Sequence, residues 1–301
     1  MSRELNDLGP LAQRLNALND LPDGILHDQI TPLHHIRIIK DSGQIQFYFV
    51  DPSSGALDGP MSRIELDRPL RLLAGYTQAA MLTLLWNPAP TRVCLLGMAG
   101  GRLALLFHHY FTATVIDNVD IDPAVIPIAT QYFGITFDER QRIAIQDART
   151  FLSADGSPRY DIIIMDAFRD ASDELNHLAT RQFYQLCRAR LTPGGVLCVN
   201  MLKSDRLFFE KIKTVISSFQ HVMIAELKRS LVLFGNQRRQ LTHDQIVANA
   251  ASLQRRHAFD FPFEERAAAL QTARAIVAYS SQALRDIRVL EDQDTYYPPH
   301  G

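Results

Sequence analysis

A glycine-rich turn lies between a predicted strand and a predicted helix near the first third of the chain. The apolar residues Leu95 and Leu96 run directly into Gly97-Met98-Ala99-Gly100-Gly101-Arg102, and a helical pattern follows. Small residues in such a turn let a ligand approach the backbone closely, and the first turn of the following helix offers N–H groups without intrahelical partners. The turn is therefore a candidate site for a bound nucleoside.

Acidic residues follow the ends of the next three predicted strands. Asp120 comes ~20 positions after the glycine turn, where a carboxylate can accept both hydroxyl groups of a ribose. Asp147 and Asp166 follow the third and fourth strands of this region. Ligands of open parallel sheets bind beyond the carboxyl ends of the strands, so we expect all three carboxylates at one edge of the sheet. Each Asp alone could be a helix cap, but together with the glycine turn they favour a nucleoside site.

Related nucleotide sites have different fingerprints. The G-x-G-x-x-G pattern of dinucleotide sites is absent because Ala99 stands two positions after Gly97, and no G-x-x-x-x-G-K-[ST] segment occurs. We therefore expect a mononucleoside ligand without phosphates. No metal site is predicted, because the adjacent pairs His34-His35 and His108-His109 point their side chains apart on a strand or a helix.

The elements that would hold these residues alternate in the manner of an α/β fold. Short apolar runs, typical of strands covered on both faces, alternate with amphipathic stretches. We expect seven strands at 93–96, 113–121, 143–145, 162–165, 196–199, 222–224 and 231–234, and helices at 103–110, 123–133, 180–191 and 205–219. The short segment around Arg229 predicts a hairpin between the last two strands. This pattern indicates a Rossmann-like, seven-stranded sheet of the class I methyltransferase type.

Two further regions flank this sheet. Before it we expect a helix over 3–19, a hairpin of the runs 33–40 and 44–50, and a helix over 66–86. After it, residues 242–280 show helical periodicity. The prediction is a small β-rich N-terminal domain with a preceding helix (1–65), a catalytic domain (66–236) and a helical C-terminal extension (237–301).

Composition narrows the choice of partners and compartment. The formal net charge is −2, so there is no long-range attraction for nucleic acid or an anionic membrane, and we expect neither as a partner. No stretch reaches the ~18 apolar residues of a membrane span, and the N-terminus lacks an apolar leader pattern, so we expect a cytoplasmic protein. Cys94, Cys187 and Cys198 stand alone in apolar sequence and are expected to be reduced core residues.

The region from Val93 to Asn200 resembles the shared core of the spermidine synthase-like proteins, a family within the methyltransferase folds. The similarity is carried by the glycine turn, by Val119-Asp120-Ile121-Asp122, by Asp147-Ala148 and by Tyr160 to Asp166, and weaker similarity extends it to about 25–235. The resemblance implies a donor site of Gly97, Ala99, Gly100, Gly101, Arg102, Asp120, Ile121, Asp147, Ala148 and Asp166. It also implies that Asp166 is the catalytic aspartate, that Tyr76 is a gate residue, that Asp170 shapes the acceptor side, and, by analogy, that the protein is a homodimer or homotetramer.

Departures from the family pattern bear on the donor and the acceptor. Polyamine-forming members have an acidic residue, which holds the amine of decarboxylated S-adenosylmethionine, where this chain has Gly100. Leu72-Leu73 and Gln78 also replace acidic family positions, and the family's Asp-Ser-Ser-Asp catalytic loop has become Asp166-Ala167-Phe168-Arg169-Asp170. A dicationic diamine needs several buried carboxylates. We therefore expect intact S-adenosylmethionine as the donor, with Arg102 beside its tail, and methyl transfer to a small amine-bearing acceptor that Asp166 orients or deprotonates.

Two other functions are compatible with the same residues. The first is a polyamine aminopropyltransferase that uses decarboxylated S-adenosylmethionine. The second is a nucleoside-binding protein without catalysis, which the loss of acidic residues would explain.

Overall fold

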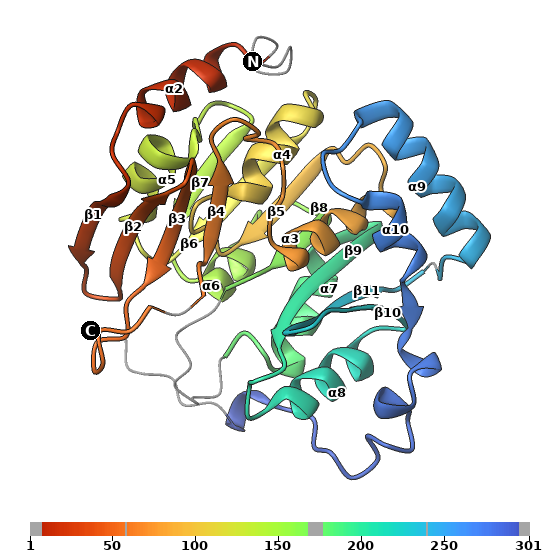
Figure 1. The fold of residues 1–301 in the computed structure, drawn as a ribbon. Helices are drawn as coiled ribbons and strands as arrows, with labels where there is room; N and C mark the ends of the chain where they lie inside the picture. The colour runs from red at the N-terminus through yellow and green to blue at the C-terminus, as the bar shows by residue number, and fades with distance from the viewer. Residues whose placement is uncertain (1–7, 58, 168–176, 239, 295–301) are drawn as a thin grey trace.

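Two β-sheets make up the framework of the computed structural model, which describes residues 8–57, 59–167, 177–238 and 240–294 (Figure 1). Helix α2 (Pro10–Asn19) precedes the smaller sheet. That sheet is antiparallel and has the order β1 (Gly24–Ile30), β2 (His35–Asp41), β3 (Gln44–Phe49) and β4 (Ser62–Glu65). It packs on the helical layer of the larger sheet, because α2 contacts α5 and β4 contacts α4.

The larger sheet has the strand order β12-β10-β11-β9-β8-β5-β6-β7. Its parallel part consists of β5 (Arg92–Leu96), β6 (Val115–Asp120), β7 (Gln141–Ile145), β8 (Tyr160–Met165) and β9 (Leu191–Leu202). Strand β11 (Ser230–Asn236) runs antiparallel between β9 and β10 (His221–Glu226), and β12 (Gln271–Thr272) pairs with β10 at the edge. The chain builds outward from β5 first to one side and then to the other, which creates the switch point where ligands bind in such sheets.

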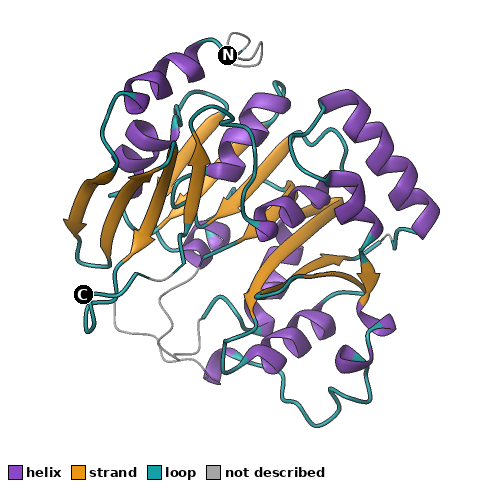
Figure 2. Cartoon of the chain, viewed as in Figure 1, coloured by secondary structure: helices purple, strands orange, loops and turns teal. Residues whose placement is uncertain are grey.

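Alternate side chains of the strands enter two apolar layers, as the period of two of a β-strand requires. Val93 and Leu95 pack toward α4 (Arg102–Tyr110), α5 (Val125–Phe133), α3 (Gly75–Ala80), the 3-10 helix η1 (Met81–Leu85), α9 (His243–His257) and α10 (Phe263–Ala268). Cys94 and Leu96 pack toward α6 (Ala148–Ser153), α7 (Arg181–Arg190) and α8 (Phe208–Ser218). Figure 2 shows the helices flanking the strands. Helices thus cover both faces, as expected, and the three cysteines are buried and free.

The helix expected over 66–86 is wrong in its first half. Residues 66–74 form turns and irregular structure, and α3 begins only at Gly75. Pro69 has no N–H group to donate in a helix, and its carbonyl and that of Arg71 accept hydrogen bonds from the Arg102 side chain instead. Residues 66–74 therefore connect the small sheet to α3 without forming a helix.

The C-terminal extension is helical only in part. After α9 and α10 the chain adds β12, an eighth strand, and then the short 3-10 helices η2 (Ala273–Ala275), η3 (Val277–Tyr279) and η4 (Asp292–Asp294). The seven expected strands are all present, and β1, β4 and α6 are further elements that periodicity did not predict. The division of the chain into three domains stays a prediction. Within the described ranges, no helix combines the length and apolar character needed to cross a membrane.

Candidate nucleoside and acceptor site

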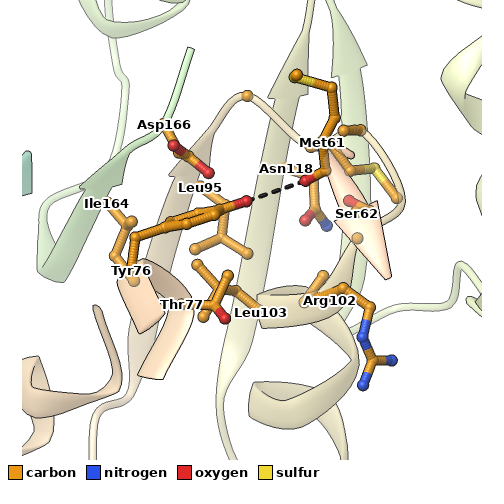
Figure 3. Close-up of a pocket in the computed structure, with 15 residues that line it drawn as sticks. Met61, Ser62, Tyr76, Thr77, Leu95, Arg102, Leu103, Asn118, Ile164 and Asp166 are labelled. Atoms are coloured by element: carbon orange, nitrogen blue, oxygen red, sulfur yellow. Dashed lines mark hydrogen bonds between the residues drawn. The ribbon is translucent and has the colours of Figure 1, made fainter. Parts of the chain in front are cut away.

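A pocket lies at the carboxyl ends of β5 and β8, at the switch point of the sheet (Figure 3). The space between its lining residues amounts to about 440 Å³, a figure that includes solvent at the open side. The lining residues come from the small sheet, from α3, from the glycine turn with α4, and from the central strands. They are Met61, Ser62, Tyr76, Thr77, Leu95, Gly97, Met98, Ala99, Gly101, Arg102, Leu103, Ala104, Asn118, Ile164 and Asp166.

Gly97 brings the glycine turn into contact with the strand that carries Asp166. Its φ of +89° is a left-handed conformation, and a Cβ atom at this position would lie 2.6 Å from the Asp166 carbonyl oxygen. The Asp166 N–H donates in turn to the Leu96 carbonyl at 2.9 Å. Position 97 therefore requires glycine because the backbone of Asp166 packs directly against it, whether or not a ligand also approaches.

Gly100 faces the protein and does not line the pocket. Its N–H donates to the Ser62 hydroxyl at 3.0 Å. A Cβ atom at position 100 would lie 2.7 Å from the Ser62 Cβ atom and 2.9 Å from the Phe133 ring. The space that an acidic side chain would need at this position is thus filled by two other residues.

Asp120 holds the glycine turn in place. Its Oδ2 accepts from the N–H groups of Met98 at 2.8 Å and Ala99 at 3.3 Å, and its Oδ1 accepts from the Asp122 N–H at 3.1 Å. A carboxylate has about four acceptor sites, so this arrangement leaves capacity for a ribose hydroxyl. Ile121, the next residue, is 40% exposed and offers an apolar surface at the same strand end.

Asp147 lies one strand further along the same edge, at the start of α6. Its Oδ1 caps this helix by accepting from the Thr150 N–H at 2.9 Å, and its Oδ2 lies 2.5 Å from Nε2 of His177. Burial alone would raise the pKa of Asp147, but the hydrogen bonds from His177 and Thr150 outweigh it and lower the pKa to about 2. Ala148 is buried in the first turn of α6. Neither residue lines the pocket. The observed role of Asp147 is that of a helix cap, and its contact with a ligand stays a prediction.

Asp166 and Tyr76 face each other across the pocket. The Asp166 carboxylate accepts from Nδ2 of Asn200 at 3.0 Å, and burial raises its pKa to about 7 although bonds from Asn200 and Tyr76 oppose the rise. The Tyr76 hydroxyl donates to the Met61 carbonyl at 3.0 Å and lies toward Asp166 (Figure 3). Burial and the nearby carboxylate raise the pKa of Tyr76 well above its usual value. The structure thus places the expected gate residue beside the expected catalytic aspartate.

Arg102 lies at the start of α4 with its guanidinium directed away from Asp166 (Figure 3). Its Nη2 donates to the carbonyl groups of Pro69 and Arg71. The residue is 5% exposed, and burial lowers its pKa to about 9. Nε and Nη1 have no hydrogen-bond partner in the part of the chain that is described. Its role beside the donor tail stays a prediction.

Several residues that line the pocket, and Asn200, which contacts Asp166 from outside the lining, were not predicted. Met61 and Ser62 precede and begin β4, an element without a periodic signal, so nothing in the sequence pointed to them. Asn118 and Asn200 could have been found, because each is a polar residue inside an apolar strand run. Both have a buried Oδ1 atom without a hydrogen-bond partner among the described residues. Asp170 lies outside the described residues. Within those residues no group of three potential ligands for a metal ion occurs.

Comparison with known sequences identifies relatives of two kinds. The chain is 30% identical over 151 residues to a polyamine aminopropyltransferase of Vibrio vulnificus, an alignment that covers half of each protein. It is 31% identical over 143 residues to the human eEF1A lysine and N-terminal methyltransferase, covering 42% of this chain and 20% of that protein. The chain thus matches half of the bacterial relative's length and a fifth of the human one's.

Comparison with solved structures supports the fold. A probable spermidine synthase from Corynebacterium glutamicum superposes with a TM-score of 0.68 at 17% identity, covering 93% of this chain and 99% of that one. Human methyltransferase-like protein 13, solved with SAH, superposes with a TM-score of 0.53 at 24% identity, covering 61% and 89%. Both show a methyltransferase-type α/β architecture like the one observed here.

A family model described as the spermine/spermidine synthase domain matches residues 79–234, slightly more than half of the chain. The matched region contains the glycine turn, Asp120, Asp147 and Asp166. Tyr76 and the small sheet precede it, and α9 and α10 follow it. The chain belongs to the spermine/spermidine synthase family.

Proposed function

We propose that the chain is a transferase that uses an S-adenosylmethionine-type donor and moves the methyl group of the intact donor to an amine. The glycine turn, Asp120 and Asp147 form the proposed nucleoside side of the site, and Asp166 and Tyr76 form the acceptor side. Its relatives, named as aminopropyltransferases and as a methyltransferase, support the coarser activity.

The filled space at Gly100 is the observation that carries the choice of donor. An acidic side chain at this position would meet Ser62 and Phe133, so the site has no carboxylate there to bind the amine of a decarboxylated donor. A donor tail that keeps its own carboxylate meets no repulsion from this position. Arg102 ends the turn, but its guanidinium is directed away from Asp166 and donates to the carbonyl groups of Pro69 and Arg71, so the choice of donor rests on position 100 and not on Arg102.

The acceptor side favours an amine with a single charge or none. Asp166 is the one carboxylate among the described residues that line the pocket. One buried carboxylate cannot balance the two ammonium groups of a diamine, because each unpaired buried charge is costly. The raised pKa of Asp166 suits a group that takes up a proton near neutral pH.

The residues then have the following roles. When bound, S-adenosylmethionine supplies a methyl carbon attached to a positively charged sulfur. The protein aligns the acceptor nitrogen with that carbon and excludes water, which is most of what such a displacement requires. Asp166 accepts the proton that the nitrogen loses as its new C–N bond forms and the C–S bond breaks. Asn200 holds the carboxylate through its Nδ2 donor, and Tyr76, which donates to the Met61 carbonyl, lines the pocket beside it.

Calorimetry with the two donors tests the proposal. We expect intact S-adenosylmethionine and its product S-adenosylhomocysteine to bind, and the decarboxylated donor to bind at least tenfold more weakly. Asp120→Ala is the matched control, because it should weaken all three nucleosides alike. Tight binding of the decarboxylated donor with no binding of the intact one would overturn the methyl-transfer reading.

Aminopropyl transfer is the second candidate, and the names of the bacterial relatives favour it. Product analysis with a panel of amines separates the two reactions. Methyl transfer releases S-adenosylhomocysteine, whereas aminopropyl transfer releases methylthioadenosine.

A further inference from the structure

The last part of the described chain returns to the helices beside the proposed donor site. Leu290 is fully buried, its N–H donates to the Thr214 hydroxyl on α8 at 2.9 Å, and its carbonyl accepts from the Arg181 N–H at the start of α7 at 2.8 Å. These backbone contacts fix the course of the chain before η4. The segment from Leu290 to Asp292, here called the C-terminal clasp, therefore has a defined position against the larger sheet's helices.

Asp292 directs the C-terminal clasp toward α6. Its Oδ2 lies 2.6 Å from Nη2 of Arg149, and its Oδ1 accepts from the Thr180 hydroxyl at 2.7 Å. Its N–H donates to Oε1 of Gln182 at 3.1 Å. The Arg149 side chain is 15% exposed and the Asp292 side chain 39%, so water screens this pair mainly from the Asp292 side.

Arg149 connects Asp292 to the nucleoside side of the site. Its Nη1 donates to the His177 carbonyl at 3.2 Å, and the His177 ring in turn lies 2.5 Å from Oδ2 of Asp147. Asp147 also caps α6, the helix that carries Arg149. A continuous series of polar contacts thus runs from Asp292 through Arg149 and His177 to Asp147.

We propose that Asp292 is a positioning residue for the donor site, acting through Arg149 and His177 on Asp147. The inference rests on the proposed function in that it takes Asp147 as a contact of the nucleoside. Arg149 donates to the Asp292 carboxylate on one side and to the His177 carbonyl on the other, so removing the charge of Asp292 weakens one of the contacts that hold Arg149 and loosens its hold on the chain at His177. The family model ends at residue 234, so the C-terminal clasp would add to the site a support from outside the matched domain.

The test uses the full-length chain with Asp292→Asn, which keeps the size of the side chain and removes its charge. Glu291→Gln is the matched control. Glu291 lies in the same clasp and accepts from Gln182 at 2.8 Å, but it makes no contact with Arg149 in the described structure. Calorimetry with S-adenosylhomocysteine should show about fivefold weaker binding for Asp292→Asn, and little change for Glu291→Gln. The double variant Arg149→Met/Asp292→Asn should bind no more weakly than Arg149→Met alone.

A measurement without ligand separates this inference from the proposed function. Hydrogen exchange of the amides at 147–152 and 177–180 should be faster in Asp292→Asn than in wild type or in Glu291→Gln. Unchanged exchange and unchanged affinity, or a lower Tm in both clasp variants without a specific loss of affinity, would overturn the inference. If exchange is faster in Asp292→Asn but the wild-type protein binds neither donor nor S-adenosylhomocysteine, the link to Asp147 stands and the proposed function is overturned.

Discussion

Replacing Asp166 by Asn tests the chemistry and the electrostatics of the pocket together. Burial raises the pKa of this carboxyl group from 3.8 to about 7. Below pH 3.8 the group is protonated in both the folded and the unfolded chain. Above that pH the unfolded chain ionises first, so the stability that the protonated group contributes is lost as the pH rises through about 7. The full shift corresponds to at most about 4 kcal/mol, and water at the pocket mouth reduces it.

Asp166→Asn cannot ionise and avoids this loss. We expect its free energy of unfolding to exceed that of wild type at pH 8 and the difference to shrink toward pH 5, measured by urea unfolding at several pH values. Turnover should fall by roughly 10²- to 10⁴-fold, the usual contribution of a general base, while the Kd for S-adenosylmethionine changes little. Full turnover in the variant would refute the catalytic role.

Asp161→Asn is the control, because it lies on the same strand and its pKa shifts in the opposite direction. Hydrogen bonds from Thr91 and Thr192 outweigh the effect of burial and lower the pKa of Asp161. The stability that this carboxylate contributes is present at neutral pH and is lost as the pH falls. Asp161→Asn should therefore be less stable than wild type at pH 8. The same sign for both variants at pH 8 would refute the electrostatic reasoning for Asp166.

Two other substitutions test how the site is held together. Gly97→Ala should destabilise the protein by roughly 2 kcal/mol more than Gly156→Ala, measured by urea unfolding. Both positions have positive φ, but of the two only a Cβ atom at position 97 would clash with the Asp166 carbonyl oxygen. Equal losses of stability would contradict the steric reason. Asp122→Asn should lower the free energy of unfolding by about 1 kcal/mol at pH 7, because the Asp122 carboxylate pairs with His34 at 3.1 Å. This loss should disappear in acid, since a carboxylate with a lowered pKa loses its contribution as the pH falls. A loss that persists unchanged at pH 3 would contradict this.

The central sheet could be predicted because its strands are buried on both faces. Runs such as Ile162-Ile163-Ile164-Met165 have no other stable environment in a chain of this size, and all seven expected strands occur. The edge of the sheet at which the site residues lie was also predictable, because parallel strands bring their carboxyl ends together. Asp120 and Asp147 therefore lie on the expected edge, and Gly97 contacts the strand end of Asp166.

The segments that were predicted wrongly or missed owe their structure to tertiary contacts. The stretch 66–74 has enough Leu to look helical, but the Arg102 side chain binds its carbonyl groups and Pro69 interrupts it. Strand β12 has two residues and no periodicity of its own, and it exists only because the edge of β10 is available. Likewise, His177 follows no pattern that predicts its contact with the Asp147 carboxylate.

The pocket wall has two sources along the chain. Gly97 and Asp166 belong to the matched domain, whereas Met61, Ser62 and Tyr76 lie before it. Because Gly97 packs directly on the backbone of Asp166, the turn and the acid form one rigid unit that tolerates little change. The preceding stretch is tied to this unit where Ser62 accepts from the Gly100 N–H, so an exchange of that stretch between relatives could retarget the acceptor only if it keeps Ser62.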